Sequence, residues 1–233
     1  MSRRRLGVAL LALLLAAALA LSSGSAGAAE PPPRVEARAW ILIDARSGEV
    51  LTSHAAAERL PIASTTKLMT AYVALQELSL NRVVRAAPYE PIYGESLLGL
   101  RAGQRVSVGD LLHGLLMRSG NDSAHDLALA ATGSQPRFVA QMNRRAAALG
   151  LADTHYANPI GLDQRGNYSS AADLSTLSRR LMRIPVFAKI VDSRTAVLRS
   201  LRPPRRIANS NDLLRMEPWA TGIKTGHTFD AGY

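Results

Sequence analysis

Apolar residues recur every three or four positions in several stretches of this chain, and this spacing predicts helices. The clearest stretch begins near residue 64, where apolar residues follow at 68, 71, 72 and 75 with no Gly or Pro between them. Lys67 is the only charged residue from 64 to 75, so this helix is expected to be buried on nearly all sides. Further helices are expected over residues 111–117, 123–131, 136–149, 170–182 and 185–191.

Shorter stretches rich in β-branched and apolar residues predict strands. Residues 37–44 and 49–52 are typical of a hairpin, because Gly48 lies in the short turn between them. Other strand-like pieces occur at 82–84, 104–106, 195–201 and 219–228, the last as a strand edge. The intervening residues 202–206 are expected to form a basic loop.

The first residues follow a different pattern, typical of an export signal. Three arginines at 3–5 precede an uninterrupted apolar run over 6–21, and Ala26-Gly27-Ala28 fits a cleavage site for small residues. We expect residues 1–28 to be a signal peptide, with an uncleaved anchor as the alternative, and 29–36 to be a linker. The protein is then extracytoplasmic, in the periplasm, the cell wall or at the outer face of the membrane.

Residues 37–233 are long enough to bury the core of one domain. The chain has no cysteine, which excludes disulfides and a lipid-modified cysteine. Its formal net charge of +10 falls to +7 without the three arginines of the signal. Aromatic residues make up only 5%, so nucleic acid is not expected as a partner. Anionic envelope polymers or lipid head groups fit an exported basic protein better.

Ser64 and Lys67 are three positions apart and therefore share one face of the predicted helix. A desolvated lysine has a lowered pKa and can take the proton of a neighbouring serine, which makes the hydroxyl a nucleophile. The chain has 28 Lys and Arg, of which only Lys67, Lys189 and Lys224 are lysines. Arginine serves elsewhere for positive charge, so a lysine in a buried helix indicates a site that needs an amine.

Two further segments could contribute side chains to a catalytic site, but each also has an ordinary structural interpretation. Ser119-Gly120-Asn121 interrupts two helical stretches, so it either presents polar side chains at a tight turn or is a helix end with Asp122 capping the next helix. Lys224-Thr225-Gly226 places a second lysine beside a residue without a side chain, which another group can approach closely. Alone it is equally typical of an ordinary turn.

Ser64-x-x-Lys67, Ser119-Gly120-Asn121 and Lys224-Thr225-Gly226 are the first, second and third motifs of this chain. In this order they resemble the motifs of penicillin-binding proteins and serine β-lactamases. Longer segments are similar to the D-alanyl-D-alanine carboxypeptidases of peptidase family S11, over roughly residues 37–233. These segments are 61–70, 109–124, 158–162, 168–174, 209–214 and 222–228. The resemblance implies an α+β fold, with an antiparallel β-sheet flanked by helices and a mostly helical subdomain.

The resemblance also implies catalytic roles for three residues. Ser64 would attack the carbonyl between two D-alanines, with Lys67 as its base, and water would hydrolyse the acyl-enzyme. Ser119 would relay a proton to the leaving amine. The substrate would be a peptidoglycan stem peptide ending in D-Ala-D-Ala, and β-lactam antibiotics would acylate the same serine. No metal or other cofactor is needed.

Substrate binding falls, by the same resemblance, to the second and third motifs. Asn121 would bind the substrate amide, and Lys224 and Thr225 would hold the terminal carboxylate. Gly226 would let the substrate approach the backbone. The backbone N–H groups of His227 and of the nucleophile would form the oxyanion hole.

Two related activities are alternatives. A D,D-endopeptidase shares this machinery but cuts cross-links between stem peptides. A class A β-lactamase needs a Glu-x-x-Leu-Asn segment after the second motif, whereas the matching residues 77–81 precede it. The family fold continues past the third motif through further strands, so we expect this sequence to be truncated at its C-terminus, with the residue 224 strand left as an edge.

Overall fold

The computed structural model describes residues 35–232 and divides the chain into two units, Met1–Glu36 and Ala37–Tyr233. The predicted signal peptide, and the predicted linker up to residue 34, lie outside the described residues. Every helix and strand described below belongs to the second unit. Within residues 35–232, no helix is both long enough and apolar enough to cross a membrane.

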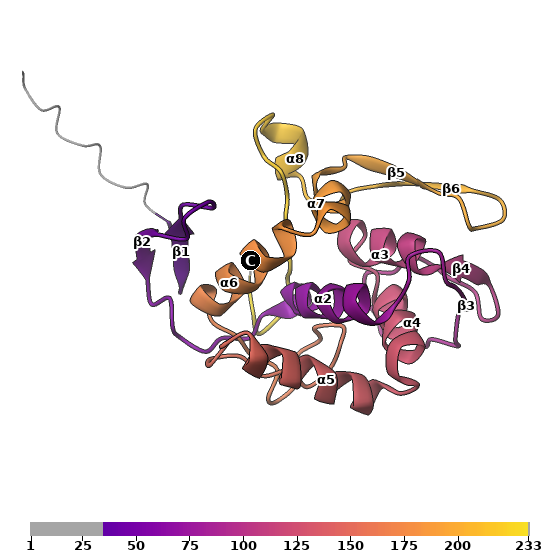
Figure 1. The fold of residues 1–233 in the computed structure, drawn as a ribbon, viewed down its shortest axis with the longest axis horizontal. Helices are drawn as coiled ribbons and strands as arrows, with labels where there is room; N and C mark the ends of the chain where they lie inside the picture. Colours follow the sequence, from indigo (N-terminus) through magenta and orange to yellow (C-terminus); the bar gives the residue numbers. More distant parts are fainter. Residues whose placement is uncertain (1–34, 233) are drawn as a thin grey trace, which may run out of the picture. The chain divides into compact units, whose positions relative to one another are not determined.

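Helix α2 (Lys67–Glu77) lies at the centre of the second unit and contacts four other helices (Figure 1). Its residues from Lys67 to Ala74 are all buried, as the apolar sequence predicts. A single 3-10 turn, η1 (Ala63–Thr66), leads into it. The helices that pack against α2 are α3 (Val108–Met117), α4 (Asn121–Thr132), α5 (Gln135–Ala148) and α6 (Ala171–Met182).

Serine side chains begin three of these helices. Ser107, Ser134 and Ser170 each accept a hydrogen bond from the backbone N–H three residues later, at α3, α5 and α6. Such caps satisfy N–H groups that have no partner inside the helix. The other helices of the described residues are α7 (Pro185–Asp192), which the sequence pattern predicted, and the short α8 (Leu213–Met216). The sequence pattern did not predict α8.

The strands form three separate two-stranded antiparallel sheets among the described residues. They are β1 (Trp40–Ile43) with β2 (Val50–His54), β3 (Val83–Arg85) with β4 (Arg105–Ser107), and β5 (Thr195–Leu198) with β6 (Arg205–Ala208). The predicted α+β class, with antiparallel strands flanked by helices, is confirmed, and the strands of the described residues pair as these three hairpins. The predicted basic loop is shorter than expected, because Arg205 and Arg206 belong to β6.

The predicted edge strand over 219–228 is wrong. Residues 220–227 have no regular secondary structure, and Thr228 pairs only in an isolated bridge with Gly232. A strand exists through its hydrogen-bonded neighbour, and no strand in the described part of the chain pairs with this segment. Its backbone therefore runs as a loop through the third motif.

Candidate active site

Ser64 and Lys67 are in direct contact at the start of the central helix. Ser64 lies in η1 and Lys67 is the first residue of α2, and the Lys67 Nζ donates a hydrogen bond of 2.9 Å to the Ser64 Oγ. Lys67 is fully buried, whereas Ser64 is partly exposed. The nucleophile is thus reachable from solvent while its neighbouring amine is not.

A loop from outside the helix completes the surroundings of the amine. The Lys67 Nζ also donates to the backbone carbonyl of Ile160. That carbonyl is positioned by Asn158, whose Oδ1 accepts the N–H of Ile160 (3.1 Å) and of Gly161 (2.6 Å). Gly161 has a φ of 84°, and a Cβ there would lie 2.1 Å from the Ala63 carbonyl oxygen. Only glycine fits this position.

The burial of Lys67 controls its protonation. Desolvation lowers the pKa of the Lys67 amine well below that of an ordinary lysine, and the nearby Lys224 ammonium lowers the pKa further. The carboxylates of Glu95 and Asp122 act in the opposite direction. The neutral amine, which is the form that can accept a proton, is therefore accessible without strongly alkaline conditions.

Two non-glycine residues of the site adopt the left-handed backbone region. Ala63, just before the nucleophile, has a φ of 45°, and Ser119 has a φ of 56°. Backbone strain of this kind costs about 1–3 kcal/mol and persists only where the surroundings hold it. Ser119 is buried between α3 and α4, so the second motif is a strained turn rather than a simple helix end.

Asn121 begins α4, and its amide orientation is set by Glu95. The Asn121 Nδ2 donates to the Glu95 Oε2 at 2.8 Å, and the Tyr89 hydroxyl donates to the same oxygen. The Glu95 Oε1 accepts the N–H of Ile92 at 3.1 Å. Partial burial raises the pKa of Glu95, but hydrogen bonds, chiefly from Tyr89 and Asn121, outweigh this and hold the pKa below its usual value. The carboxylate is therefore ionised and can only accept. The Asn121 Oδ1 is therefore the end left for another donor.

The sequence pattern left Asp122 as a possible cap of the next helix, but Asp122 does not cap α4. The helix cap is Gly120, and the Asp122 carboxylate accepts the backbone N–H groups of Leu98 (2.9 Å), Gly99 (2.7 Å) and Leu100 (3.0 Å). Asp122 is buried, so these bonds satisfy a charge that would otherwise be costly. The segment 98–100 is thereby fixed beside the second motif.

The third motif approaches the nucleophile through its glycine. A Cβ at Gly226 would lie 3.0 Å from the Ser64 nitrogen and 3.2 Å from the Thr65 nitrogen. Lys224 is half-buried, and desolvation lowers the pKa of its amine to about 8. Thr225 and His227 have exposed side chains. The structure thus brings Lys224 and Gly226 to the Ser64–Lys67 pair and leaves the two side chains between and after them at the surface.

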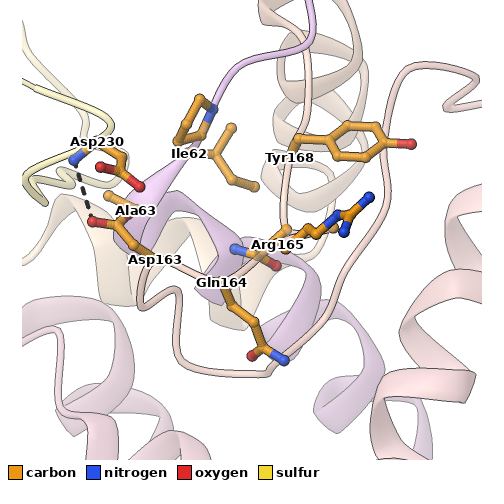
Figure 2. A pocket seen from close by; sticks show the side chains of 10 residues that line it. Ile62, Ala63, Asp163, Gln164, Arg165, Tyr168 and Asp230 are labelled. Atoms are coloured by element: carbon orange, nitrogen blue, oxygen red, sulfur yellow. Dashed lines mark hydrogen bonds between the residues drawn. The ribbon is translucent and has the colours of Figure 1, made fainter.

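Asp163 ties this loop to the rest of the site. Its Oδ1 accepts the Thr228 hydroxyl at 2.6 Å. Its Oδ2 accepts the N–H of Asp230 at 3.2 Å (Figure 2). Asp163 and Asp230 line a pocket of about 330 Å³ together with Ile62 and Ala63 (Figure 2), and Ser64 is not among its lining residues. The pocket lies next to the nucleophile rather than around it.

Sequence reasoning missed Glu95 and Asp163, and it considered Asp122 only as a cap of the next helix. Glu95 is the only charged residue from 91 to 100, and this isolation was a signal that could have singled it out. Asp163 and Asp122 had no comparable signal, because their partners lie 65 and 24 positions away. No cluster of three or more His, Cys, Asp or Glu that could hold a metal ion occurs within residues 35–232.

Comparison with known sequences identifies related proteins. The family profile described as D-alanyl-D-alanine carboxypeptidase, peptidase family S11, matches residues 26–233. The D-alanyl-D-alanine carboxypeptidase DacD of Salmonella typhimurium is 36% identical over 244 residues, covering 99% of this chain and 62% of that protein. DacB2 of Mycobacterium tuberculosis is 40% identical over 85% of this chain and 68% of its own length. The chain spans 52% of the Bacillus subtilis relative DacF.

Solved structures agree with the sequence comparison. A D-alanyl-D-alanine carboxypeptidase from Mycobacterium tuberculosis superposes with a TM-score of 0.82 at 38% identity, covering 88% of this chain and 78% of that one. A variant of a Streptomyces DD-transpeptidase gives a TM-score of 0.78 at 28% identity, covering 86% of this chain and 84% of that one. Because the family profile matches residues 26–233, nearly the whole chain, this chain belongs to the D-alanyl-D-alanine carboxypeptidase family of serine peptidases.

Proposed function

We propose that this chain is a serine-type D-alanyl-D-alanine carboxypeptidase that acts on peptidoglycan stem peptides through an acyl-enzyme on Ser64. The observation that carries the proposal is the hydrogen bond of 2.9 Å between the buried Lys67 amine and the Ser64 hydroxyl. A serine next to a desolvated amine is an activated nucleophile. The names of the relatives support the same substrate class.

In the acylation step, Lys67 takes the Ser64 proton as Oγ attacks the carbonyl carbon of the bond between the two D-alanines. A C–O bond forms and the C–N bond breaks. The proton passes from Lys67 through the Ser119 hydroxyl to the leaving amine, which departs as free D-alanine. The N–H groups of Ser64 and His227 stabilise the oxyanion, a role supported by the approach of Gly226 to the Ser64 nitrogen. Water then hydrolyses the ester.

The terminal carboxylate of the substrate binds Lys224 and Thr225. A protonated Lys224 supplies the charge, and because its pKa is lowered to about 8, carboxylate binding weakens as the pH rises above that value. Asn121 accepts a substrate amide N–H with its Oδ1, since Glu95 occupies its Nδ2. Glu95 is thus a positioning residue for Asn121.

The β-lactamase alternative is weakened by the position of Glu77. Glu77 ends α2, ten residues after Lys67, which places it about 15 Å along the helix from the amine. Its carboxylate pairs with Arg145 at 3.0 Å and accepts a hydrogen bond from Gln141 at 2.9 Å. A carboxylate held there does not activate a water at Ser64.

A D,D-endopeptidase is the second candidate, because cutting a cross-link uses the same serine, amine and oxyanion hole. The similar Streptomyces DD-transpeptidase extends the group to acyl transfer onto an amine.

We also propose export and an extracytoplasmic location, supported by the apolar run at 6–21. β-Lactam antibiotics are expected to acylate Ser64.

Incubation of the chain with benzylpenicillin, followed by intact-mass spectrometry, tests the nucleophile. We expect a stable adduct on the wild type and none on Ser64→Ala. Release of D-alanine from a pentapeptide, compared with cleavage of a cross-linked dimer, separates the two candidates. A penicillin adduct on Ser64→Ala, or turnover of neither peptide by a chain that does form the adduct, would contradict the proposal.

A further inference from the structure

The positive charge of the chain is concentrated in two hairpins. Without Arg3, Arg4, Arg5, Arg34 and Glu30, the 28 basic and 18 acidic residues fall to 24 and 17, a net charge of +7 for residues 35–232. Segments 82–107 and 194–208, which contain β3–β4 and β5–β6, hold nine arginines and two glutamates. They therefore carry the whole net charge, and the other described residues are balanced at fifteen of each sign. We call these segments the arginine hairpins.

Most of these arginines face solvent without a carboxylate partner. Eight of the nine are exposed, and none of the nine forms an ion pair among residues 35–232. The exception to exposure is Arg205, which is half-buried and donates to the carbonyl oxygens of Leu98 and Gly99. Arg205 therefore stabilises the fold. The exposed arginines are Arg82, Arg85, Arg101, Arg105, Arg194, Arg199, Arg202 and Arg206.

Like charges lie directly opposite each other within β3–β4. Arg85 pairs with Arg105 across the ladder, and both side chains are exposed. Directly opposed like charges destabilise a sheet, because each repels the other at close range. An anion bound between the two guanidinium groups would remove this repulsion and accept hydrogen bonds from both.

The two hairpins lie together at one end of the unit (Figure 1) and share a groove of about 510 Å³. Its lining combines Gln104 and Arg105 from one hairpin with Ser200 and Arg202 from the other, together with Val83. The Ser200 hydroxyl accepts the Ser107 N–H at 2.9 Å, which joins the hairpins directly. The groove is therefore lined mainly by hydrogen-bonding side chains, including two arginines.

Two carboxylates near the hairpins are already engaged. Asp110 accepts the backbone N–H of Ser200 at 2.8 Å and its hydroxyl at 2.5 Å. Asp126 accepts the Ala87 N–H at 2.8 Å and lines a smaller pocket with Arg82 and Arg85. Both carboxylates are buried, so they do not cover the exposed guanidinium groups.

We propose that the arginine hairpins bind a linear polyanion whose charges are phosphate groups, laid along the groove between Arg105 and Arg202. Arginine matches phosphate by donating two parallel hydrogen bonds. A groove suits a single chain better than the flat surface of a bilayer. Strands β3 to β6 contain no aromatic residue, and the exposed Tyr93 lies in the long loop between β3 and β4 and does not line the groove, so no aromatic side chain at the groove would anchor it in a lipid interface.

Binding to long-chain inorganic polyphosphate, measured by fluorescence anisotropy with the full chain at 50 and 200 mM salt, tests the proposal. The variant Arg85→Gln, Arg105→Gln, Arg202→Gln removes three exposed charges from the hairpins. The control Arg137→Gln, Arg180→Gln, Arg183→Gln removes three exposed charges elsewhere. Replacing the same three hairpin residues by lysine keeps their charge.

We expect wild-type affinity to fall steeply with salt. The hairpin variant should bind at least ~10-fold more weakly, with the slope of log affinity against log salt reduced by about 2, at about 0.7 for each lost contact to a flexible strand. The control should change affinity by less than about 3-fold. The lysine variant should keep the salt slope of the wild type but bind more weakly, because lysine cannot donate the paired hydrogen bonds of arginine.

Three results would overturn the proposal. Equal weakening in the control variant would show a diffuse effect of net charge. Absence of wild-type binding to polyphosphate at 50 mM salt would show that no such site exists. Binding to phosphatidylglycerol vesicles but not to polyphosphate would identify the surface as a membrane contact instead. If the hairpin variant does not fold, as judged by near-UV circular dichroism, the single variants Arg202→Gln and Arg180→Gln are compared instead, and equal affinities of these two would also overturn the proposal.

Discussion

The two lysines of the site are held in opposite ways. Lys67 is the first residue of a buried helix, and its amine has two fixed acceptors, the Ser64 Oγ and the Ile160 carbonyl. Lys224 lies in a loop without regular secondary structure, and its amine donates to the carbonyl of its own neighbour, Thr225. The difference fits the roles proposed for them. A base must be desolvated and placed against one atom, whereas a carboxylate-binding cation needs charge and reach.

The same substitution in the two lysines separates these roles. Arginine keeps a positive charge but cannot release its proton. Lys67→Arg should therefore slow acylation by benzylpenicillin about 10³-fold, within the range of a lost general base. Lys224→Arg should slow it only about 10-fold and extend activity above the pH of about 8 at which Lys224 loses its proton. Equal losses in both variants would contradict the distinction.

The loop that supports Lys67 is expected to be the next most sensitive feature. In Gly161→Ala the new Cβ would meet the Ala63 carbonyl oxygen, so the Ile160 carbonyl moves away from the amine. We expect acylation to fall about 10²-fold, as small displacements in an active site cause. Gly133→Ala is the matched control, since its φ of 80° gives similar strain but its Cβ has nothing within 4 Å. A similar loss of acylation rate in Gly133→Ala would show that backbone strain, and not displacement of the Ile160 carbonyl, causes the loss.

Glu95→Gln tests the positioning of Asn121. In this variant the Asn121 amide loses its charged hydrogen-bond partner and is held less firmly, so kcat/KM should fall about 10-fold. Because the Glu95 charge raises the pKa of Lys67, its removal lowers that pKa further, and the acidic limb of the pH profile moves to lower pH. Tyr89→Phe removes the hydroxyl but keeps the Glu95 charge, so its acidic limb should shift less. An unchanged limb in Glu95→Gln would show that the carboxylate does not act on Lys67.

The smallest effect is expected at the clamp of the third motif. Asp163→Ala removes the acceptors of Thr228 and Asp230 and loosens the loop that carries Lys224. Substrate binding should weaken, raising KM about 3-fold with kcat nearly unchanged. Asp192→Ala, an exposed carboxylate at the end of α7, should change neither constant. A fall in kcat without a change in KM would place Asp163 in the chemistry itself.

The helix with Ser64 and Lys67 was predictable because its signals are local. Helical periodicity and the three-residue spacing place the two side chains together without knowledge of any other segment. The resemblance to a known family also named Ser119, Asn121 and the third motif in the right order. The acceptor from Ile160 was not predictable, because it lies 93 positions from Lys67.

The strand predicted over the third motif failed for a related reason. Small residues around Lys224 fit an extended backbone, but a strand also needs a paired neighbour, and none pairs with residues 220–227 in the part of the chain described here. Glu95 and Asp163 were missed because their roles depend on long-range hydrogen bonds. Local patterns thus predicted the Ser64–Lys67 pair, and tertiary contacts determine the residues that surround it.

Burial lowers the pKa of the Lys67 amine well below that of an ordinary lysine, and the composition makes this shift directly measurable. With only three lysines, lysine labelled with ¹³C at the ε carbon gives three resonances, and Lys67→Arg and Lys189→Arg variants assign them. We predict that the Lys67 resonance titrates well below the ordinary lysine value of about 10.4. A Lys67 resonance that stays cationic up to that pH would contradict the account of the lysine as the base.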